Sequence, residues 1–409
     1  MKKILIIAAA VLLLASCTEK KDFAVDPAGY DFTEVITYGN PFHLGIIGED
    51  FTRLQMYYSS VTKTDATHYA VKGYSKVGDN VQLFEGVIEL KSIKKVVFEE
   101  GAEADHVDNH DVYLLESQYD FNQADGSFEG KISNDIMFKD GKVLTDVCYE
   151  GADGYDNNQH MGTFTRTNGQ TTVANWGVWR VPDSDDLDQG VGEFIPSEKY
   201  HDAGWASYYK ALYAEDEVEK ANNLFEELRD WWNPDAPKIT AQGPRNLMDN
   251  PMKQYEPDTY FIEANTPKGV STIIFPSTVT PEYSDINFDG YKDLYQLDDK
   301  GYCYLYDPEL KEFGGCPSYN KIQYKGYLSV YPEGKYLTTS HYDLNTGKHF
   351  FYMYNYDPEK GFCPTGSITE KDGAWEEFDQ DGNKIKDAAN PGELSQVWAD
   401  YIKRTMGQY

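Results

Sequence analysis

The segment Phe84-Glu85-Gly86-Val87-Ile88 and its echo Phe128-Glu129-Gly130-Lys131-Ile132 decide the fold class of this chain. Each copy follows a turn, Gly78-Asp79-Asn80 in the first case and Asp125-Gly126 in the second. Alternation of apolar with polar or small residues is typical of a β-strand that buries one face. Two such units predict an antiparallel meander, closed into a barrel or folded as a sandwich.

Composition extends this interpretation to the whole chain. The 33 tyrosines and 20 phenylalanines favour strands, and the period of two recurs at 54–58, 68–72 and 81–84. A length of 409 residues exceeds what a single core usually serves. We therefore expect a mainly β protein with two antiparallel β domains, each a barrel or sandwich, joined by an amphipathic helix and a Pro-rich linker, with a short C-terminal helix.

Changes of pattern along the chain give the expected boundaries. Aromatic and apolar residues from Trp205 to Trp232 have helical spacing until Asn233-Pro234, and Pro234 is the first of five prolines up to Pro257. Asn390 and Pro391 are suited to start a last helix with one apolar face. The expected parts are a signal peptide (1–16), a tether (17–35), an N-terminal antiparallel β domain (36–182), an acidic loop with the helix and linker (183–258), and a calcium-loop β domain with the C-terminal helix (259–409).

The N-terminus predicts export and a lipid anchor. Lys2 and Lys3 precede an unbroken apolar run, Ile4 to Leu14, which is a secretory signal and is too short to span a membrane. The following Leu14-Ala15-Ser16-Cys17 resembles the bacterial lipobox, in which the signal is cleaved before a lipid-modified cysteine. The resemblance implies acylation of Cys17, palmitate included, and anchoring in the bacterial cell envelope at the outer membrane, facing the periplasm or the exterior.

Charge excludes one class of partner. Without its two signal-peptide lysines the chain carries 35 basic and 68 acidic residues, so its net charge is 35 − 68 = −33. Such a chain is repelled by the phosphates of nucleic acid and by anionic lipid surfaces. We therefore expect no nucleic-acid partner, and attachment to the membrane through the N-terminal lipid alone.

Asp285-Ile286-Asn287-Phe288-Asp289-Gly290-Tyr291-Lys292-Asp293 has the spacing of a calcium loop. Asp285, Asn287, Asp289 and Asp293 stand at positions one, three, five and nine, the carbonyl of Tyr291 stands at seven, and glycine at six permits the sharp turn. Position twelve is Gln296 where a helix–loop–helix site has glutamate, so the site is not of that type. A further oxygen would come from Asp298, Asp299 or Glu282. We predict a structural Ca²⁺ here.

This motif also carries a resemblance to known families. Asp285 to Leu294, followed by Tyr304-Leu305-Tyr306-Asp307-Pro308-Glu309 and Phe313, resembles FG-GAP-like calcium loops. The region from about 260 to 385 is also similar to bacterial envelope lipoproteins related to the periplasmic lysozyme inhibitors. The resemblance implies a β-sandwich-like domain and inhibition of a peptidoglycan hydrolase. No stretch matches an inhibitory loop, so no inhibitory residues are assigned.

Export also makes disulfides possible. If Tyr306 and Phe313 face each other across a hairpin, Cys303 stands opposite Cys316, close enough to bridge. An internal echo of Tyr302–Cys316 at Tyr352–Cys363 offers Cys316 and Cys363 as an alternative pair. Cys148 is expected to remain a thiol.

The sequence contains no catalytic motif of the common kinds: it lacks a nucleophile elbow, a zinc-protease helix and a phosphate-binding glycine loop. His106, Asp108 and His110 are expected to lie in a solvated loop, and Asp379-Gln380-Asp381-Gly382-Asn383 in a hairpin turn. We expect a non-enzymatic, lipid-anchored envelope protein that binds an envelope protein or a glycan. Inhibition of a lysozyme-like hydrolase is one alternative. Another is a glycan-binding module that uses aromatics such as Trp176 and Trp179, or a glycan hydrolase.

Overall fold

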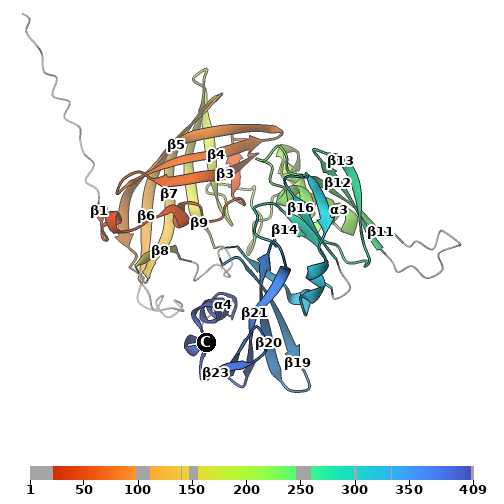
Figure 1. Cartoon of the computed structure of the whole chain (residues 1–409). Helices are drawn as coiled ribbons and strands as arrows, with labels where there is room; N and C mark the ends of the chain where they lie inside the picture. The colour runs from red at the N-terminus through yellow and green to blue at the C-terminus, as the bar shows by residue number, and fades with distance from the viewer. Residues whose placement is uncertain are drawn as a thin grey trace, which may run out of the picture. The chain divides into compact units, whose positions relative to one another are not determined.

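The computed structural model describes residues 22–97, 111–139, 141–146, 155–245, 259–298, 302–332 and 334–406. The chain divides into two compact units, and the boundary between them lies between Asp183 and Ser184. Asp50–Arg53 is grouped with the second unit although it precedes this point. The protein is mainly β, and its sheets are almost entirely antiparallel (Figure 1).

Unit 1 is a closed eight-stranded barrel, which decides between the two architectures that the sequence left open. Each strand pairs with the next one along the barrel, β5 also pairs with β6, and β10 closes the ring onto β2. Closure removes the free edges of the sheet. The strands are β2 (Leu44–Ile47), β3 (Thr52–Lys63), β4 (His68–Val77), β5 (Asn80–Lys95), β6 (Val112–Gln123), β7 (Gly126–Lys139), β9 (Asn157–Arg166) and β10 (Thr171–Val178).

The repeated motif explains the packing of this barrel. Phe84 and Phe128 both point inward, where the ring of Phe84 stacks on Phe121 with centroids 4.9 Å apart. A Cβ atom on Gly86 would lie 1.9 Å from the carbonyl oxygen of Asp120, and one on Gly130 would lie 2.3 Å from that of Met161. The phenylalanines therefore fill the interior, and the glycines let neighbouring strands approach closely.

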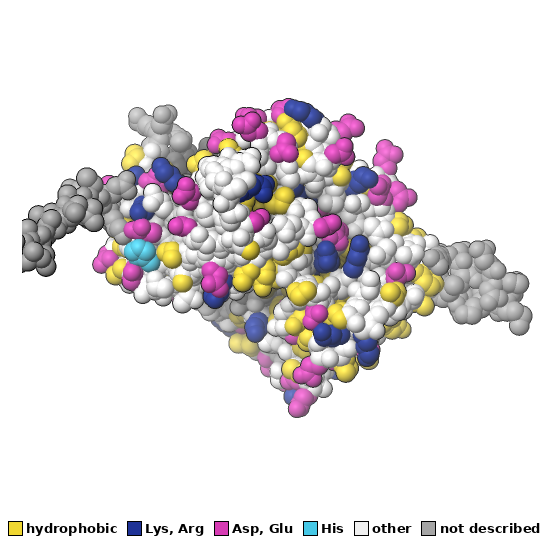
Figure 2. All heavy atoms as spheres, turned by 90° about the horizontal axis from the view of Figure 1, so that it is seen from above, with side chains coloured by type: hydrophobic (Ala, Val, Ile, Leu, Met, Phe, Trp, Pro, Cys, Tyr) yellow, Lys and Arg dark blue, Asp and Glu magenta, His cyan; other side chains and the backbone are white. Residues whose placement is uncertain are grey.

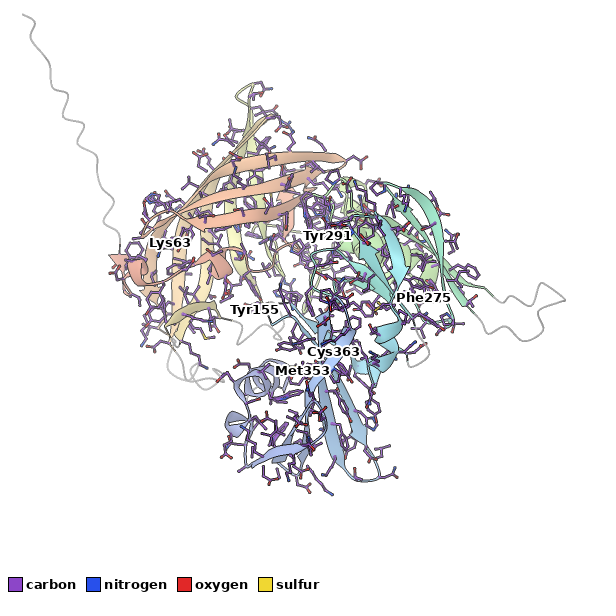
Figure 3. The ribbon with its side chains drawn as sticks, viewed as in Figure 1. Lys63, Tyr155, Phe275, Tyr291, Met353 and Cys363 are labelled. Carbon is purple, nitrogen blue, oxygen red and sulfur yellow. The ribbon has the colours of Figure 1, made fainter. Side chains whose placement is uncertain are left out.

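The segment expected to be a tether is part of unit 1 from Asp22 onward. β1 (Asp22–Phe23) pairs with β5, and α1 (Thr33–Ile36) buries Val35 in the barrel core. Lys63, labelled in Figure 3, donates hydrogen bonds to the carbonyls of Pro27, Ala28 and Tyr30. Phe32, Val35 and Ile36 belong to the barrel core, so residues 22–35 pack on the barrel and the expectation of a tether there was wrong. The short β8 (Lys142–Thr145) pairs with β7.

Two helices open unit 2 where one helical stretch was expected. α2 (Ala206–Tyr213) ends before Asp216, and α3 (Glu217–Leu228) begins with the Asp216 carboxylate accepting a hydrogen bond from the N–H of Glu219. The C-cap of α2 is Ala214, and the aspartate caps the start of the next helix. The guanidinium of Arg53 forms a bidentate ion pair with Glu227, with exposed side-chain fractions of only 10% and 15%.

The remaining strands of unit 2 form three sheets. The strand β11 (Lys238–Arg245) falls inside the stretch expected to be a Pro-rich linker, so that part of the expectation was wrong. The first sheet is β11 (Lys238–Arg245), β12 (Thr259–Thr266) and β13 (Gly269–Phe275), and the second is β14 (Glu282–Ser284), β15 (Asp293–Tyr295), β16 (Cys303–Asp307) and β17 (Glu312–Gly315). The third is β18 (Ser329–Tyr331), β19 (Tyr336–Asp343), β20 (Lys348–Asp357), β21 (Gly361–Lys371), β22 (Ala374–Asp379) and β23 (Lys384–Ala388).

The C-terminal helix covers one face of this third sheet. α4 (Gln396–Met406) places Trp398, Tyr401 and Ile402 in one buried cluster with Phe351 and Met353 of β20 (Figures 1 and 3). Pro391 begins a short 3₁₀ turn ahead of the helix instead of the helix itself. The apolar stripe of the helix docks as expected, and on the opposite face of the sheet Leu337 and Tyr354 are buried in a second cluster with Tyr319 and Ile322.

Candidate functional site

The Asp285–Asp293 loop folds around its own backbone amides. The Asp285 carboxylate accepts hydrogen bonds from the N–H groups of Asp289 (3.2 Å) and Gly290 (2.8 Å), and Asp289 accepts one from Tyr291 (2.9 Å). Gly290 has φ of +91°, which only glycine adopts readily. These contacts give the tight turn that the calcium spacing predicts, with Tyr291 at its end (Figure 3).

Asp293 is the most buried carboxylate of this loop. Its side chain is fully buried and accepts hydrogen bonds from the N–H of Ile286 (3.1 Å) and from that of Tyr306 on β16 (2.9 Å). Burial raises its pKa well above the ordinary value, and the charges of Asp289 and Asp285 raise it further. Burial likewise raises the pKa of Asp285. In both carboxyl groups burial is the main cause of the raised pKa, and the neighbouring carboxylates add to it.

The donor chemistry suits calcium, and the side-chain oxygens of Asp285 and Asn287 both accept from the N–H of Asp289, at 3.2 Å each. Carboxylate, amide and carbonyl oxygens are the ligands of a hard cation. Yet in the part of the chain that the structure describes, no group of three or more His, Cys, Asp and Glu side chains is placed to hold a metal ion. Gln296, at position twelve, is buried and donates instead to the carbonyl of Val279 (2.5 Å), and Asp298 accepts from Ser277. Asp299 lies outside the described residues.

The three described cysteines of unit 2 are free thiols in this structure. Cys303 is buried on β16, and the backbone N–H of Cys316 donates to its carbonyl at 2.8 Å. Hydrogen bonds from the Cys303 thiol and the Ser318 hydroxyl lower the pKa of Cys316 to about 6, against the opposing effect of burial. The sulfur of Cys363 on β21, which is labelled in Figure 3, points at the carbonyl of Gly361 (3.5 Å).

An aromatic surface occupies the face of the third sheet opposite α4. Tyr324, outside the strands, lies parallel to His341 with ring centroids 4.2 Å apart and an interplanar angle of 4°, and it also stacks on Tyr352 at 5.7 Å. His341 pairs with Phe350 across β19 and β20, so both lie on this face. Tyr324 is 36% exposed. We call Tyr324, His341, Phe350 and Tyr352 the aromatic platform.

Polar groups adjoin the platform on the same sheet face. Lys348 and Lys384 both donate to the Glu376 carboxylate, at 2.9 and 2.8 Å, and the hydroxyl of Thr369 donates to it at 3.0 Å. These hydrogen bonds lower the pKa of Glu376 to about 2, and the one from Lys384 has the largest effect. Thr369 pairs with Phe350 across β20 and β21, which places this network beside the platform. The face therefore combines flat rings with ordered hydrogen-bonding groups.

The conformation of Tyr324 is unusual. Its φ of +55° lies in the left-handed region, which costs a non-glycine residue of order 1 kcal/mol. Such strain persists where surrounding contacts hold it, here the stack on His341 and Tyr352. The stack covers part of the Tyr324 ring, while the residue remains 36% exposed to solvent.

The barrel interior holds a polar cluster that sequence reasoning did not identify. His160 donates from Nδ1 to the carbonyl of Asn158 (2.9 Å), so its Nε2 accepts from the Tyr58 hydroxyl (2.8 Å). His160 also stacks on Trp176 at 4.5 Å. Burial lowers the pKa of His160 well below its ordinary value and that of His43 to about 4. Both imidazoles are therefore neutral near pH 7, and both are enclosed by the barrel.

Several sequence predictions fall elsewhere or on undescribed residues. Trp176 is fully buried in the barrel, so the idea that it forms an exposed platform was wrong; Trp179 is 50% exposed. Cys17, Cys148 and the His106–His110 segment lie outside the described residues. Strand alternation could have placed His341 and Phe350 on one face, but no local signal brings Tyr324 to them. In the described parts of the chain, no helix is long and apolar enough to cross a membrane.

No protein-family model matches this chain, and no curated protein matches it either.

Proposed function

We propose that this protein is a lipid-anchored protein of the bacterial cell envelope that binds a neutral glycan through the aromatic platform. The observation that carries the proposal is the parallel stack of Tyr324 on His341, backed by Tyr352, on the sheet face that α4 leaves open. The lipid anchor is Cys17, on the strength of the lipobox-like sequence.

The chemistry of a sugar suits this surface. Aromatic side chains offer a large apolar area whose position is fixed by few rotatable bonds, and the C–H face of a pyranose ring packs on such a surface. Its hydroxyl groups would then find donors and acceptors in Thr369 and in the Lys348–Glu376–Lys384 network. A net charge of −31 for the whole chain favours a neutral glycan over an acidic one.

Within this proposal, unit 2 is stabilised by Ca²⁺ at the Asp285–Asp293 loop. Asp285, Asn287, Asp289, Asp293 and the Tyr291 carbonyl would hold the ion, which supplies positive charge to buried carboxylates and takes no part in chemistry. The spacing of oxygen donors along the loop supports this assignment, together with the tight turn closed by the N–H of Gly290 and the Asp285 carboxylate. Inhibition of a lysozyme-like hydrolase remains a second candidate, supported by the acidity of the chain, which suits a basic enzyme.

Affinity electrophoresis tests the glycan proposal. Native gels would contain dextran, mannan, xylan or laminarin, and we expect at least one to retard the wild type. Tyr324→Ala should migrate as it does without polysaccharide. Tyr342→Ala is the matched control, because Tyr342 is 48% exposed and lies on the other face of the same sheet, against His349. Equal retardation of the wild type and Tyr324→Ala would contradict the platform. Slowed lysis by lysozymes, with no retardation in any gel, would favour the inhibitor instead.

A further inference from the structure

The hairpin of β16 and β17 brings two thiols opposite each other. Tyr304 pairs with Gly315, so the next pair along the ladder is Cys303 with Cys316. The N–H of Cys316 donates to the carbonyl of Cys303 at 2.8 Å, which confirms that the two residues are direct partners. Directly opposed residues joined in this way have Cα atoms about 5.5 Å apart, within the range that a disulfide spans.

The side chains share one face of the hairpin and contact each other. Cys303 is 1% exposed, and Cys316 is half-buried, with its sulfur 3.1 Å from the Ser318 hydroxyl. Directly opposed residues of an antiparallel pair have Cβ atoms about 4.5–5.5 Å apart, so the two thiols are neighbours. The sulfur of Cys363 is instead directed toward the carbonyl of Gly361, two residues earlier in the chain. Ser318, whose hydroxyl oxygen accepts from the N–H of Phe362 (3.2 Å), stands between Cys316 and β21.

We propose that Cys303 and Cys316 form a disulfide in the exported protein, and that this bond braces the Asp285–Asp293 loop. The connection to the loop is direct, because Tyr306 on β16 donates its N–H to the buried carboxylate of Asp293. Leu294 of β15 pairs with Tyr304 of β16 as well. A bond that fixes the hairpin therefore fixes the strand that holds the loop's most buried carboxylate.

The oxidant is the disulfide of a thiol–disulfide oxidoreductase or of oxidised glutathione. The Cys316 thiolate attacks one sulfur of that disulfide, forms a mixed disulfide and releases the other sulfur as a thiolate. The Cys303 thiol passes its proton to the released thiolate and attacks the Cys316 sulfur. The second half of the oxidant then leaves as a thiolate, which takes up the proton that Cys316 lost on ionising. Two protein thiols are oxidised, and one disulfide is reduced to two thiols.

Cys316 has the properties of the attacking group. It is the more exposed of the two sulfurs, and the Cys303 thiol and the Ser318 hydroxyl stabilise its thiolate. The buried Cys303 is then held in position for the second attack, since it already contacts Cys316. This order of events follows from the geometry of the pair.

Peptide mapping after oxidation tests the proposal without depending on where the protein resides. The purified full chain is equilibrated with oxidised glutathione, alkylated with iodoacetamide and digested with trypsin. Cleavage at Lys300, Lys311, Lys321, Lys360 and Lys371 puts Cys303, Cys316 and Cys363 on three separate peptides, 301–311, 312–321 and 361–371. We expect 301–311 linked to 312–321, two hydrogen atoms lighter than their sum, and 361–371 alkylated alone.

Two other outcomes would overturn the proposal. One is alkylation of all three peptides, and the other is a link from 312–321 to 361–371 or to the peptide that contains Cys148. The Cys363→Ser variant is the control and should leave the 301–311 link unchanged. In the oxidised wild type, a reductant should lower the melting temperature of unit 2, while Cys316→Ser should show no response to reductant. A wild type that melts equally with and without reductant would show that the bond does not brace the loop.

Discussion

The calcium loop makes the sharpest quantitative prediction. Asp285, Asp289 and Asp293 supply three carboxylates, and loops of this kind in extracellular modules bind with dissociation constants of about 10⁻⁴ to 10⁻³ M. At about 10 mM Ca²⁺, binding to the folded state alone would stabilise unit 2 by about 1.4–2.7 kcal/mol, from RT ln(1 + [L]/Kd). For a unit of this size that corresponds to an increase in melting temperature of about 3–10 °C.

The assay is thermal unfolding followed by circular dichroism, in calcium and in a chelator. Asp289→Ala should melt at the same temperature in both, because a carboxylate at position five of the loop is lost. Asp381→Ala is the control, since Asp379 to Asn383 imitates half a calcium loop but forms the turn between β22 and β23, with Asp379 accepting from the N–H groups of Asp381 and Asn383. A wild type that melts identically in calcium and chelator would refute the calcium assignment, as would an Asp289→Ala variant that keeps the full shift.

Three further predictions concern the stability of the two units. Glu227→Gln leaves a buried guanidinium without its counter-charge and should cost about 3–5 kcal/mol in urea unfolding, whereas Glu219→Gln, in an exposed pair, should cost less than about 0.5 kcal/mol; equal costs would contradict the burial argument. Burial raises the pKa of Asp135 to about 6 from 3.8, so its contribution to the stability of unit 1 is fully present below about pH 4 and lost as the pH rises through 6. Asp135→Asn should therefore raise the stability at pH 8 by about 1–2 kcal/mol, with allowance for solvent screening, and flatten the pH profile measured by thermal melts; an unchanged profile would show that this group does not titrate as argued. A Cβ on Gly162 would lie 2.2 Å from the carbonyl oxygen of Glu129, so Gly162→Ala should destabilise the barrel by about 1–3 kcal/mol or more; Gly29→Ala, with nothing within 4 Å, should be neutral in the same denaturant titration, and a tolerated Gly162→Ala would argue against the close strand approach.

Local pattern was sufficient to predict the strands but not their closure. The alternation around Phe84 and Phe128 follows from one buried face, so it appears in the sequence itself. Whether the meander closes depends on the pairing of β10 with β2, which joins residues more than 120 positions apart. No short-range signal reports such a pairing, and barrel and sandwich have the same alternation.

The errors in the helical region have a local cause. The apolar spacing from Trp205 to Trp232 suggested one stretch, whereas Asp216 caps α3 and separates it from α2. An aspartate three residues before Glu219 is a recognised start signal, so this break was readable in the sequence. The strand β11 was missed because Pro244 favoured a linker, yet it pairs with Tyr260 on β12 at the edge of a sheet, where a proline is tolerated.

The two candidate sites differ in how far sequence could reach. The Asp285–Asp293 loop is contiguous, so its turn and its carboxylates were predictable from spacing. The aromatic platform joins Tyr324 to residues on β19 and β20, and the backbone of Tyr324 has a left-handed conformation. Side chains brought together by tertiary structure leave no motif, and Figure 2 shows how hydrophobic and charged side chains intermingle on one face of the protein.

The most direct test of glycan binding is a comparison of affinities by isothermal titration calorimetry. Oligosaccharides of the polysaccharide that retards the wild type most would be titrated into the wild type, Tyr324→Ala and Tyr342→Ala. The account predicts that the loss of Tyr324 raises the dissociation constant at least about tenfold, or about 1.4 kcal/mol, with no change for Tyr342→Ala. Equal dissociation constants for all three proteins would contradict it.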